Sequence, residues 1–259
     1  MHTRRSFLAG AASVASAAHA QDPRFSVLIL TGESDHPHHD WRATTPLLKD
    51  LLEKTGRVDV KVTEQPLRVT AQSLAGYDAL VVNYNGPRWG EQVERAVEEF
   101  VRSGRGLVAF HLSSYGAFFG LTSRGGRFER SGGGWPAWPE MVGVTWKPEN
   151  IGHARRHVFR VKWVEREHPI ARGLEESFLA NDELYHRMDL HPEARVLATA
   201  FSEPPQGGTG RDEPMLWTVA FGKGRVAFTP LGHDTAAMSQ PGFATLFARA
   251  TEWAAGRLR

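Results

Sequence analysis

The sequence predicts an α/β domain of three layers, in which a mostly parallel sheet is flanked by helices on both faces. Short apolar segments alternate with amphipathic segments through the first half of the chain, as in parallel strands joined by crossover helices. The chain has 259 residues, of which 41% are hydrophobic and 23% charged. That length and balance suit a single soluble α/β domain with a substantial core.

The elements of the first half follow from their apolar patterns. Residues 25–30 are almost all apolar and end at Thr31-Gly32, so we expect a buried strand that enters a loop. A helix is expected to begin at Thr44 or Thr45, with Pro46 in its first turn, and to end at Gly56. Further strands are predicted at 58–62, 77–83 and 107–110, and a helix at 91–102. The strand at 107–110 leads directly into His111.

The second half returns to short strands, at 158–164, 194–199, 215–219 and 226–229, and closes with a helix at 243–255. Gly222-Lys223-Gly224 is typical of a tight hairpin turn between the last two strands. Residues 116–149 show no such pattern and are rich in glycine and tryptophan. We interpret this segment as a functional cover, whose tryptophans either anchor it to the body or stack on sugar rings.

The first twenty residues have the features of an export signal. Thr3-Arg4-Arg5-Ser6-Phe7-Leu8 is a twin-arginine pattern, an alanine-rich apolar run follows, and Ala18-His19-Ala20 is a small-residue cleavage site. The apolar run is too short and too weakly apolar to span a bilayer. We therefore expect a signal peptide at 1–20, a domain at 21–259, and a soluble periplasmic product without membrane insertion.

Charge and cysteine content exclude several classes of function. The chain has 31 Lys and Arg against 29 Asp and Glu. Without Arg4 and Arg5 it has 29 of each sign, so no basic excess favours a nucleic-acid partner. The absence of cysteine excludes disulfides, thiolate metal ligands and a cysteine nucleophile. The oligomeric state is left open, and a homo-oligomer is compatible with the sequence.

Four segments carry side chains suited to chemistry, and three of them follow predicted strands. In 36–41, alternate histidines suit metal ligation, although Asp40 is equally suited to cap the next helix. His111 occupies the strand end typical of a nucleophile elbow, or is a hydrogen-bonded core histidine. Segment 181–186 offers Asp182 and Glu183, or is a solvated turn. Segment 231–234 offers His233, with Asp234 suited to orient a histidine. Since ligands bind beyond the carboxyl ends of parallel strands, we expect these histidines to be functional.

Taken in order, these segments resemble the ThuA-like (trehalose utilisation) family. The resemblance rests on 27–32, 39–42, 104–111, 168–170, 182–185 and 222–225 leading to 231–234, and runs from about residue 25 to the end. It implies a class I glutamine amidotransferase-like, or flavodoxin-like, fold and an association with carbohydrate use. The amidotransferase nucleophile is a cysteine, and here His111 stands at that position. Glutamine amidotransferase activity is therefore excluded.

With this resemblance, the leading hypothesis is an exported enzyme that acts on a sugar or keto-glycoside, with a small-molecule carbohydrate as its partner. The expected catalytic residues are His111, Asp182, Glu183 and His233. The expected substrate-binding residues are Asp40, Trp41, Tyr185 and Arg225, with Trp41 and Trp135 as an apolar sugar platform. The expected ligands of a divalent metal, zinc or similar, are His39, His111, Glu183 and His233.

Two alternatives stay open at this point. The chain is either an enzyme or a non-catalytic sugar-binding or accessory protein that uses the degenerate amidotransferase-like pocket. A hydrolase with Ser113 or Ser114 as nucleophile ranks lowest, because neither serine stands at the elbow position.

Overall fold

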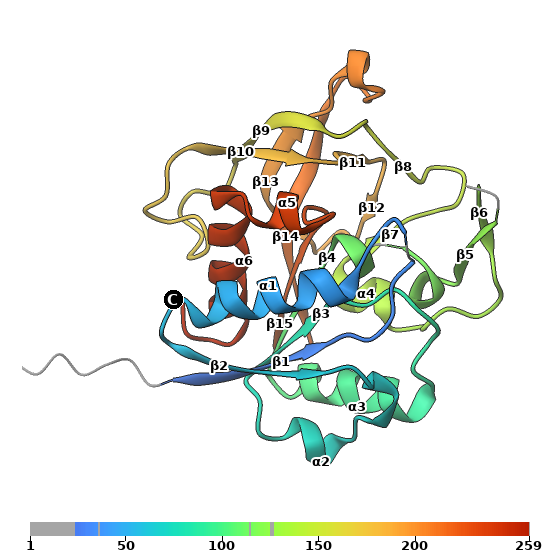
Figure 1. Ribbon diagram of the computed structural model, residues 1–259, viewed down its shortest axis with the longest axis vertical. Coiled ribbons are helices and arrows are strands. Elements are labelled where there is room, and N and C mark those ends of the chain that lie inside the picture. Colours follow the sequence, from blue (N-terminus) through green and yellow to red (C-terminus); the bar gives the residue numbers. More distant parts are fainter. Residues whose placement is uncertain (1–23, 36, 114, 125–126, 259) are drawn as a thin grey trace, which may run out of the picture.

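The structure, a computed structural model, describes residues 24–35, 37–113, 115–124 and 127–258 (Figure 1). The predicted signal peptide at 1–20 and Ser114 lie outside the described residues. A nine-stranded sheet forms the centre, in the order β10-β9-β13-β14-β15-β4-β3-β1-β2. Its strands are β1 Phe25–Leu30, β2 Val58–Thr63, β3 Ala79–Val82, β4 Gly106–Phe110, β9 His157–Trp163, β10 Ser177–Asp182, β13 Arg195–Phe201, β14 Asp212–Phe221 and β15 Gly224–Thr229.

The remaining elements are helices and short strand pairs. The α-helices are α1 Trp41–Glu53, α2 Ala71–Leu74, α3 Glu91–Arg102, α4 Trp138–Val142, α5 Thr235–Met238 and α6 Pro241–Ala254. The short strands pair as β5 Leu121–Arg124 with β6 Arg127–Arg130, β7 Val144–Thr145 with β12 Asp189–Leu190, and β8 Gly152–His153 with β11 Tyr185–His186. Single turns of 3-10 helix are η1 Pro66–Arg68, η2 His111–Ser113, η3 Ala117–Phe119 and η4 Pro204–Gln206.

Strand direction is the property of the sheet that matters most for the site. The strands β2, β1, β3, β4 and β15 pair in parallel. Beyond β15, every pairing through to β10 is antiparallel, so β13 and β10 run with the parallel group while β14 and β9 run against it. Seven of the nine strands therefore share one direction, which confirms the predicted mostly parallel sheet.

Alternate residues of the strands supply the two cores of a three-layer domain. In β1, Val27 and Ile29 join the core beneath α1 and α6, whereas Leu28 and Leu30 join the core beneath α3 and α4. Such complete burial of both faces is expected of strands in a parallel sheet, with helices covering each side (Figure 1). The predicted three-layer architecture is confirmed.

Most predicted elements are present, and their ends are decided by local hydrogen bonds. The helix expected from Thr44 or Thr45 begins earlier, at Trp41, because the Asp40 side chain accepts a hydrogen bond from the backbone N–H of Arg42 at 2.9 Å. The predicted turn at 222–224 joins antiparallel β14 and β15. The sequence did not reveal β10, in which only Ala180 and Asp182 are buried and one of these two is an acid.

The glycine- and tryptophan-rich segment is ordered around an aromatic cluster. Trp135 and Trp138 are 1% and 0% exposed, and they stack on each other with ring centroids 5.2 Å apart. The Nε1–H of Trp135 donates to Glu98 of α3 at 2.7 Å. These two tryptophans are therefore anchors, and the expectation that Trp135 forms a sugar platform is wrong.

Within the described ranges, no helix is both long and apolar enough to cross a membrane.

His168 of the segment 168–170 has a structural role. It is buried, its Nδ1 accepts a hydrogen bond from the backbone N–H of Ile170 at 3.2 Å, and its ring packs on Trp253 of α6. Burial, assisted by the positive charge of Arg195, lowers the pKa of His168 to about 4 from an ordinary value of 6.5. The native state therefore requires the neutral imidazole.

This requirement predicts a pH dependence of stability. As pH falls below 6.5, His168 becomes protonated in the unfolded state but stays neutral in the folded state. The free energy of unfolding therefore decreases progressively down to about pH 4. The loss assignable to His168 is on the order of 2 kcal/mol. Urea unfolding of wild type and His168→Gln at pH 7.5 and pH 4.5 measures it, because the glutamine variant should lose less stability on acidification. An equal loss in both proteins would contradict this assignment.

Candidate active site

Four histidine- and acid-bearing segments meet at one edge of the sheet because the strands before them share a direction. His39 lies in the loop after β1, His111 directly follows β4, and His233 lies beyond β15. Glu183 follows the edge strand β10, which runs the same way. Segments separated by up to about two hundred positions in the chain therefore arrive at the same place, as binding residues of α/β sheets commonly do.

The side chains converge on Nε2 of His111. Nε2 of His39 lies 3.0 Å from it and Nδ1 of His233 lies 3.1 Å from it. Oε2 of Glu183 lies 3.9 Å from the same atom and 3.3 Å from Nδ1 of His233. The four residues expected from the sequence to share a metal are thus brought together.

Asp182 is close to the cluster but serves the backbone. Its carboxylate is almost fully buried and accepts from the backbone N–H groups of Gly232 at 2.6 Å, Glu183 at 2.8 Å and His233 at 3.3 Å. Burial raises its pKa to about 6, against the opposing effect of these hydrogen bonds. The carboxylate does not line the pocket, so the structure does not place Asp182 where the predicted catalytic role would require it.

Hydrogen bonds on the outer side of two imidazoles fix their tautomers. Nδ1 of His111 lies 2.8 Å from the Pro230 carbonyl oxygen, which can only accept, so Nδ1 carries the proton. Nδ1 of His39 lies 2.6 Å from Oδ1 of Asp35. The other carboxylate oxygen of Asp35, Oδ2, accepts a hydrogen bond from the Tyr115 hydroxyl at 2.7 Å. In their neutral forms both rings therefore direct an Nε2 lone pair at the same point.

The electrostatics of the buried cluster favour neutral His111. Burial lowers the pKa of His111 well below its usual range, and the charges of His39 and His233 lower it further. A neutral imidazole with a free Nε2 lone pair is the form that ligates transition metals. Burial and the nearby carboxylates raise the pKa of Tyr185, and its protonated hydroxyl lies 3.1 Å from Nε2 of His111.

His233 and Glu183 form an ion pair at the open side of the cluster. Burial lowers the pKa of His233, but its hydrogen bond to Glu183 and the charges of Glu183 and Asp182 outweigh burial and raise it overall. For Glu183 burial acts to raise the pKa, and the hydrogen bond to His233 with the charges of the histidines lowers it overall. Both side chains are 19% exposed, so this pair meets whatever enters the pocket.

These residues fit a divalent transition metal. Nitrogen atoms of His39, His111 and His233 lie within 4.8 Å of one another, and Glu183 adds a carboxylate. Two ligand nitrogens on a tetrahedral zinc ion lie about 3.3 Å apart, close to the separations found here. Two inward lone pairs 3.0 Å apart repel each other unless a cation or a proton lies between them.

Three members of the cluster, His39, Glu183 and His233, line a pocket of about 230 Å³, and His111 is fully buried next to them. The rest of the lining mixes aromatic and polar side chains, and no lysine or arginine occurs among the described residues that line it. Tyr185 lines the pocket, as expected for a substrate-binding residue. The full lining is Asp35, His38, His39, Tyr115, Ser123, Phe128, Trp146, Ile151, His153, Glu183, Tyr185 and His233.

Three predicted substrate-binding residues are not brought to the pocket. Asp40 is exposed and caps α1, while Trp41 is buried as the first residue of that helix. Arg225 is the second residue of β15, opposite Gly106 and about 13 Å of strand away from the edge that bears the cluster. Its exposed guanidinium donates to the backbone carbonyl of Trp253, in the last turn of α6, at 3.2 Å.

The sequence did not single out several residues that complete the site. Asp35 and Tyr115 support His39, and Trp146 and His153 line the pocket beside Tyr185. Asp35 lies in the loop already flagged for its histidines, and Tyr115 follows the strand end at His111. Their placement after strands was a usable signal, whereas nothing in the sequence separates Trp146 from the buried tryptophans near it.

Ser113 does not face the histidines. It is 1% exposed, and its hydroxyl donates to the Phe110 carbonyl at 2.8 Å and accepts from the Phe110 N–H at 3.2 Å. A hydroxyl held on its own turn is not a nucleophile activated by an adjacent base. The hydrolase reading for Ser113 is therefore not supported by this geometry.

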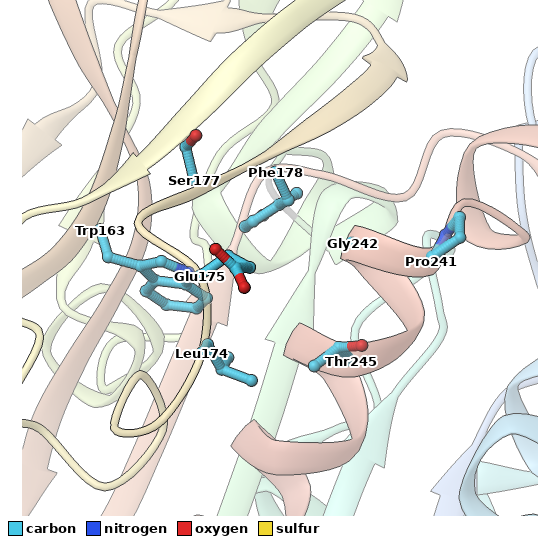
Figure 2. Close-up of a pocket in the computed structure, with 8 residues that line it drawn as sticks. All are labelled: Trp163, Leu174, Glu175, Ser177, Phe178, Pro241, Gly242 and Thr245. Carbon is cyan, nitrogen blue, oxygen red and sulfur yellow. The ribbon is translucent and has the colours of Figure 1, made fainter.

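A second pocket lies between the β9–β10 edge and the first turns of α6 (Figure 2). It measures about 210 Å³, and Trp163, Phe178 and Leu174 supply most of its apolar surface. Glu175 is the one titratable residue that lines it within the described chain, and none of the predicted site residues contributes. Of these two pockets, the one beside the histidine cluster is therefore the candidate functional site.

Comparison with known proteins agrees with this arrangement. Residues 26–254 match the ThuA family, described as trehalose utilisation. This chain belongs to the ThuA family. A search among curated proteins gave no match.

Solved structures of ThuA-like proteins have the same fold. A ThuA-like protein from Parabacteroides merdae is 30% identical, with a TM-score of 0.72 over 91% of both chains. One from Bacteroides uniformis is 19% identical, with a TM-score of 0.68 over 92% of this chain and 94% of that one. A protein from Salmonella typhimurium, titled a cytoplasmic protein, is 16% identical, with a TM-score of 0.63 over 89% and 98%. The expected glutamine amidotransferase-like fold is thereby shown.

The support of His39 predicts a measurable effect on metal binding. Replacing Asp35 with Asn removes the carboxylate that holds the Nδ1–H tautomer, so affinity for Zn²⁺ or Co²⁺ should fall roughly 10- to 100-fold. Asp40→Asn in the same loop is the matched control, because asparagine also caps a helix and Asp40 does not touch the cluster. Isothermal titration of the three proteins with Co²⁺ measures the difference. Equal affinities for wild type and Asp35→Asn would show that His39 is not positioned in this way.

Proposed function

We propose that this ThuA-family chain is an enzyme of carbohydrate metabolism that acts on a neutral sugar or keto-glycoside with the help of a divalent metal. The observation that carries the proposal is the pair of inward Nε2 lone pairs of His39 and His111, 3.0 Å apart beside Glu183. Two lone pairs that face each other repel, and a cation bound between them turns this repulsion into attraction.

The pocket suits an uncharged ligand with one apolar side and one hydroxyl-rich side. Trp146, Tyr185 and Phe128 present rings, whereas Glu183 and His233 present acceptors and donors. Without a lysine or arginine in its described lining, the pocket has no partner for a phosphate or carboxylate. The family's description as trehalose utilisation agrees with a neutral sugar.

Each side chain then has a role consistent with its position. A divalent metal held by His39, His111, His233 and Glu183 would polarise a carbonyl oxygen or activate a water molecule. Tyr185 keeps its proton, and its hydroxyl, 3.1 Å from Nε2 of His111, would be released to donate to a ligand oxygen once a metal took up that lone pair. The aromatic wall binds the ring and excludes water, which strengthens the polar interactions within the pocket.

One observation favours a second candidate, a sugar-binding or accessory protein without catalysis. Asp182, which the sequence indicated as a proton carrier, is fully engaged by three backbone N–H groups. A binding protein would need the walls of the pocket but no further acid or base.

Metal dependence distinguishes these candidates. Purified protein should contain a divalent metal, and a chelator should abolish turnover of a keto-glycoside such as a keto derivative of trehalose. His111→Ala should lose more activity than the roughly 10- to 100-fold that removal of a supporting group costs. The exposed His191, remote from the pocket lining, gives the control variant His191→Ala.

The outcomes separate the two readings. Stabilisation by trehalose against thermal unfolding, with no product, would identify a binding protein. Absence of metal together with full turnover by His111→Ala would show that the histidine cluster is not the active site.

We further propose that the protein is exported to the periplasm through its twin-arginine segment. The support is Arg4-Arg5 followed by the apolar run and Ala18-His19-Ala20. The cytoplasmic title of the Salmonella protein concerns a chain only 16% identical, a likeness that shows the fold alone. Replacing Arg4 and Arg5 with Lys should leave the protein uncleaved in the cytoplasm on cell fractionation. Unchanged periplasmic recovery would exclude this route.

A further inference from the structure

The hairpin formed by β5 and β6 contributes one matched pair of side chains to the pocket. Ser123 and Phe128 are direct cross-strand partners, so both project from the same face of the hairpin. Both line the pocket, whereas their neighbours Thr122 and Glu129 pair on the opposite face and are exposed. The register of the hairpin therefore separates a pocket face from a solvent face.

Phe128 is unusual among the residues of this hairpin. Six of the eight strand residues are exposed, Leu121 is buried at the base, and Phe128 is half-buried. Its ring contacts the ring of Tyr115, with centroids 5.3 Å apart. The rest of this large apolar ring is exposed at the pocket, where it is available to a ligand.

The base of the hairpin is held in place over the pocket. The N–H of Ser131 donates to the Gly120 carbonyl at 2.8 Å, and the N–H of Leu121 donates to the Gly116 carbonyl at 3.0 Å. Gly120 has a φ of +68°, and a Cβ there would lie 2.9 Å from the backbone nitrogen of Gly134. Only glycine permits this crossing of two backbones, behind which Trp135 is buried.

The same pocket also has aromatic and acidic side chains that suit a ring. Trp146 and Tyr185 line it and pack with centroids 4.7 Å apart, and Glu183, His39 and His233 add polar groups. A pyranose has an apolar face of C–H groups and a rim of hydroxyls, which matches a lining of aromatic and polar side chains. An open-chain polyol has the hydroxyls but no fixed apolar face.

We propose that Phe128 determines ligand selectivity by stacking on the apolar face of a neutral pyranose ring bound between the β5–β6 hairpin and the histidine cluster. The inference rests on the proposed function, since it takes a sugar as the ligand of this pocket. It adds a specific contact from a segment that lies outside the cluster and supplies no predicted site residue.

The test compares a cyclic sugar with an open-chain one. Affinities for trehalose and for sorbitol are measured by isothermal titration on the full-length chain loaded with Zn²⁺. Phe128→Ala should weaken trehalose binding roughly three- to tenfold and change sorbitol binding less, because only the ring offers a face for stacking. Phe128→Tyr, which keeps the ring, should retain the affinity of the wild type.

Glu129→Ala, on the solvent face of the same strand, is the control for general damage to the hairpin and should behave as wild type. Equal trehalose affinity in Phe128→Ala and wild type would overturn the inference and leave the proposed function intact. So would an equal loss of both ligands in Phe128→Ala and Glu129→Ala, because that pattern indicates a distorted hairpin. Wild-type protein that binds neither sugar would contradict the proposed function itself.

Discussion

The arrangement of the site depends on one buried carboxylate, that of Asp182. The edge strand β10 and the strand β4 stand five positions apart in the sheet, so a flat sheet would separate their ends by about 24 Å. Asp182 accepts the N–H groups of Gly232 and His233 and thereby joins the end of β10 to the loop beyond β15. This connection keeps the end of β10 close to the loop beyond β15. Oε2 of Glu183, the residue after β10, therefore lies 3.9 Å from Nε2 of His111.

Two further hydrogen bonds orient the imidazoles within the cluster. His111 receives its orientation from a backbone carbonyl and His39 from Asp35 with Tyr115 behind it. Each outer partner removes one of two tautomers, so both inner nitrogens are left with lone pairs. These two hydrogen bonds therefore hold Nε2 of His39 and Nε2 of His111 facing each other, an arrangement that a bound cation would stabilise.

The sequence predicted the parallel half of the sheet well, because its strands are apolar on both faces and each ends in a polar loop. Members of the cluster were found for the same reason, since His39, His111 and His233 each lie just beyond such a strand. Arg225 was misjudged because its place in the family motif was given more weight than its place at the start of the predicted strand 226–229. Trp41 and Trp135 were misjudged because the sequence does not distinguish a tryptophan buried in the core from one that stacks on a ligand. The edge strand β10, half-buried and irregular, offers no period from which to predict it.

The crossing of Gly120 and Gly134 has a consequence for how this protein can diverge from its relatives. The hairpin begins and ends at that crossing and hydrogen-bonds chiefly to itself and to its base. Its length and side chains can therefore change without displacing the strands that carry His39, His111 and His233. In evolutionary terms the hairpin is an exchangeable module on a fixed frame of strands. Insertion or substitution there can change the lining of the pocket while the positions of the three histidines are inherited unchanged.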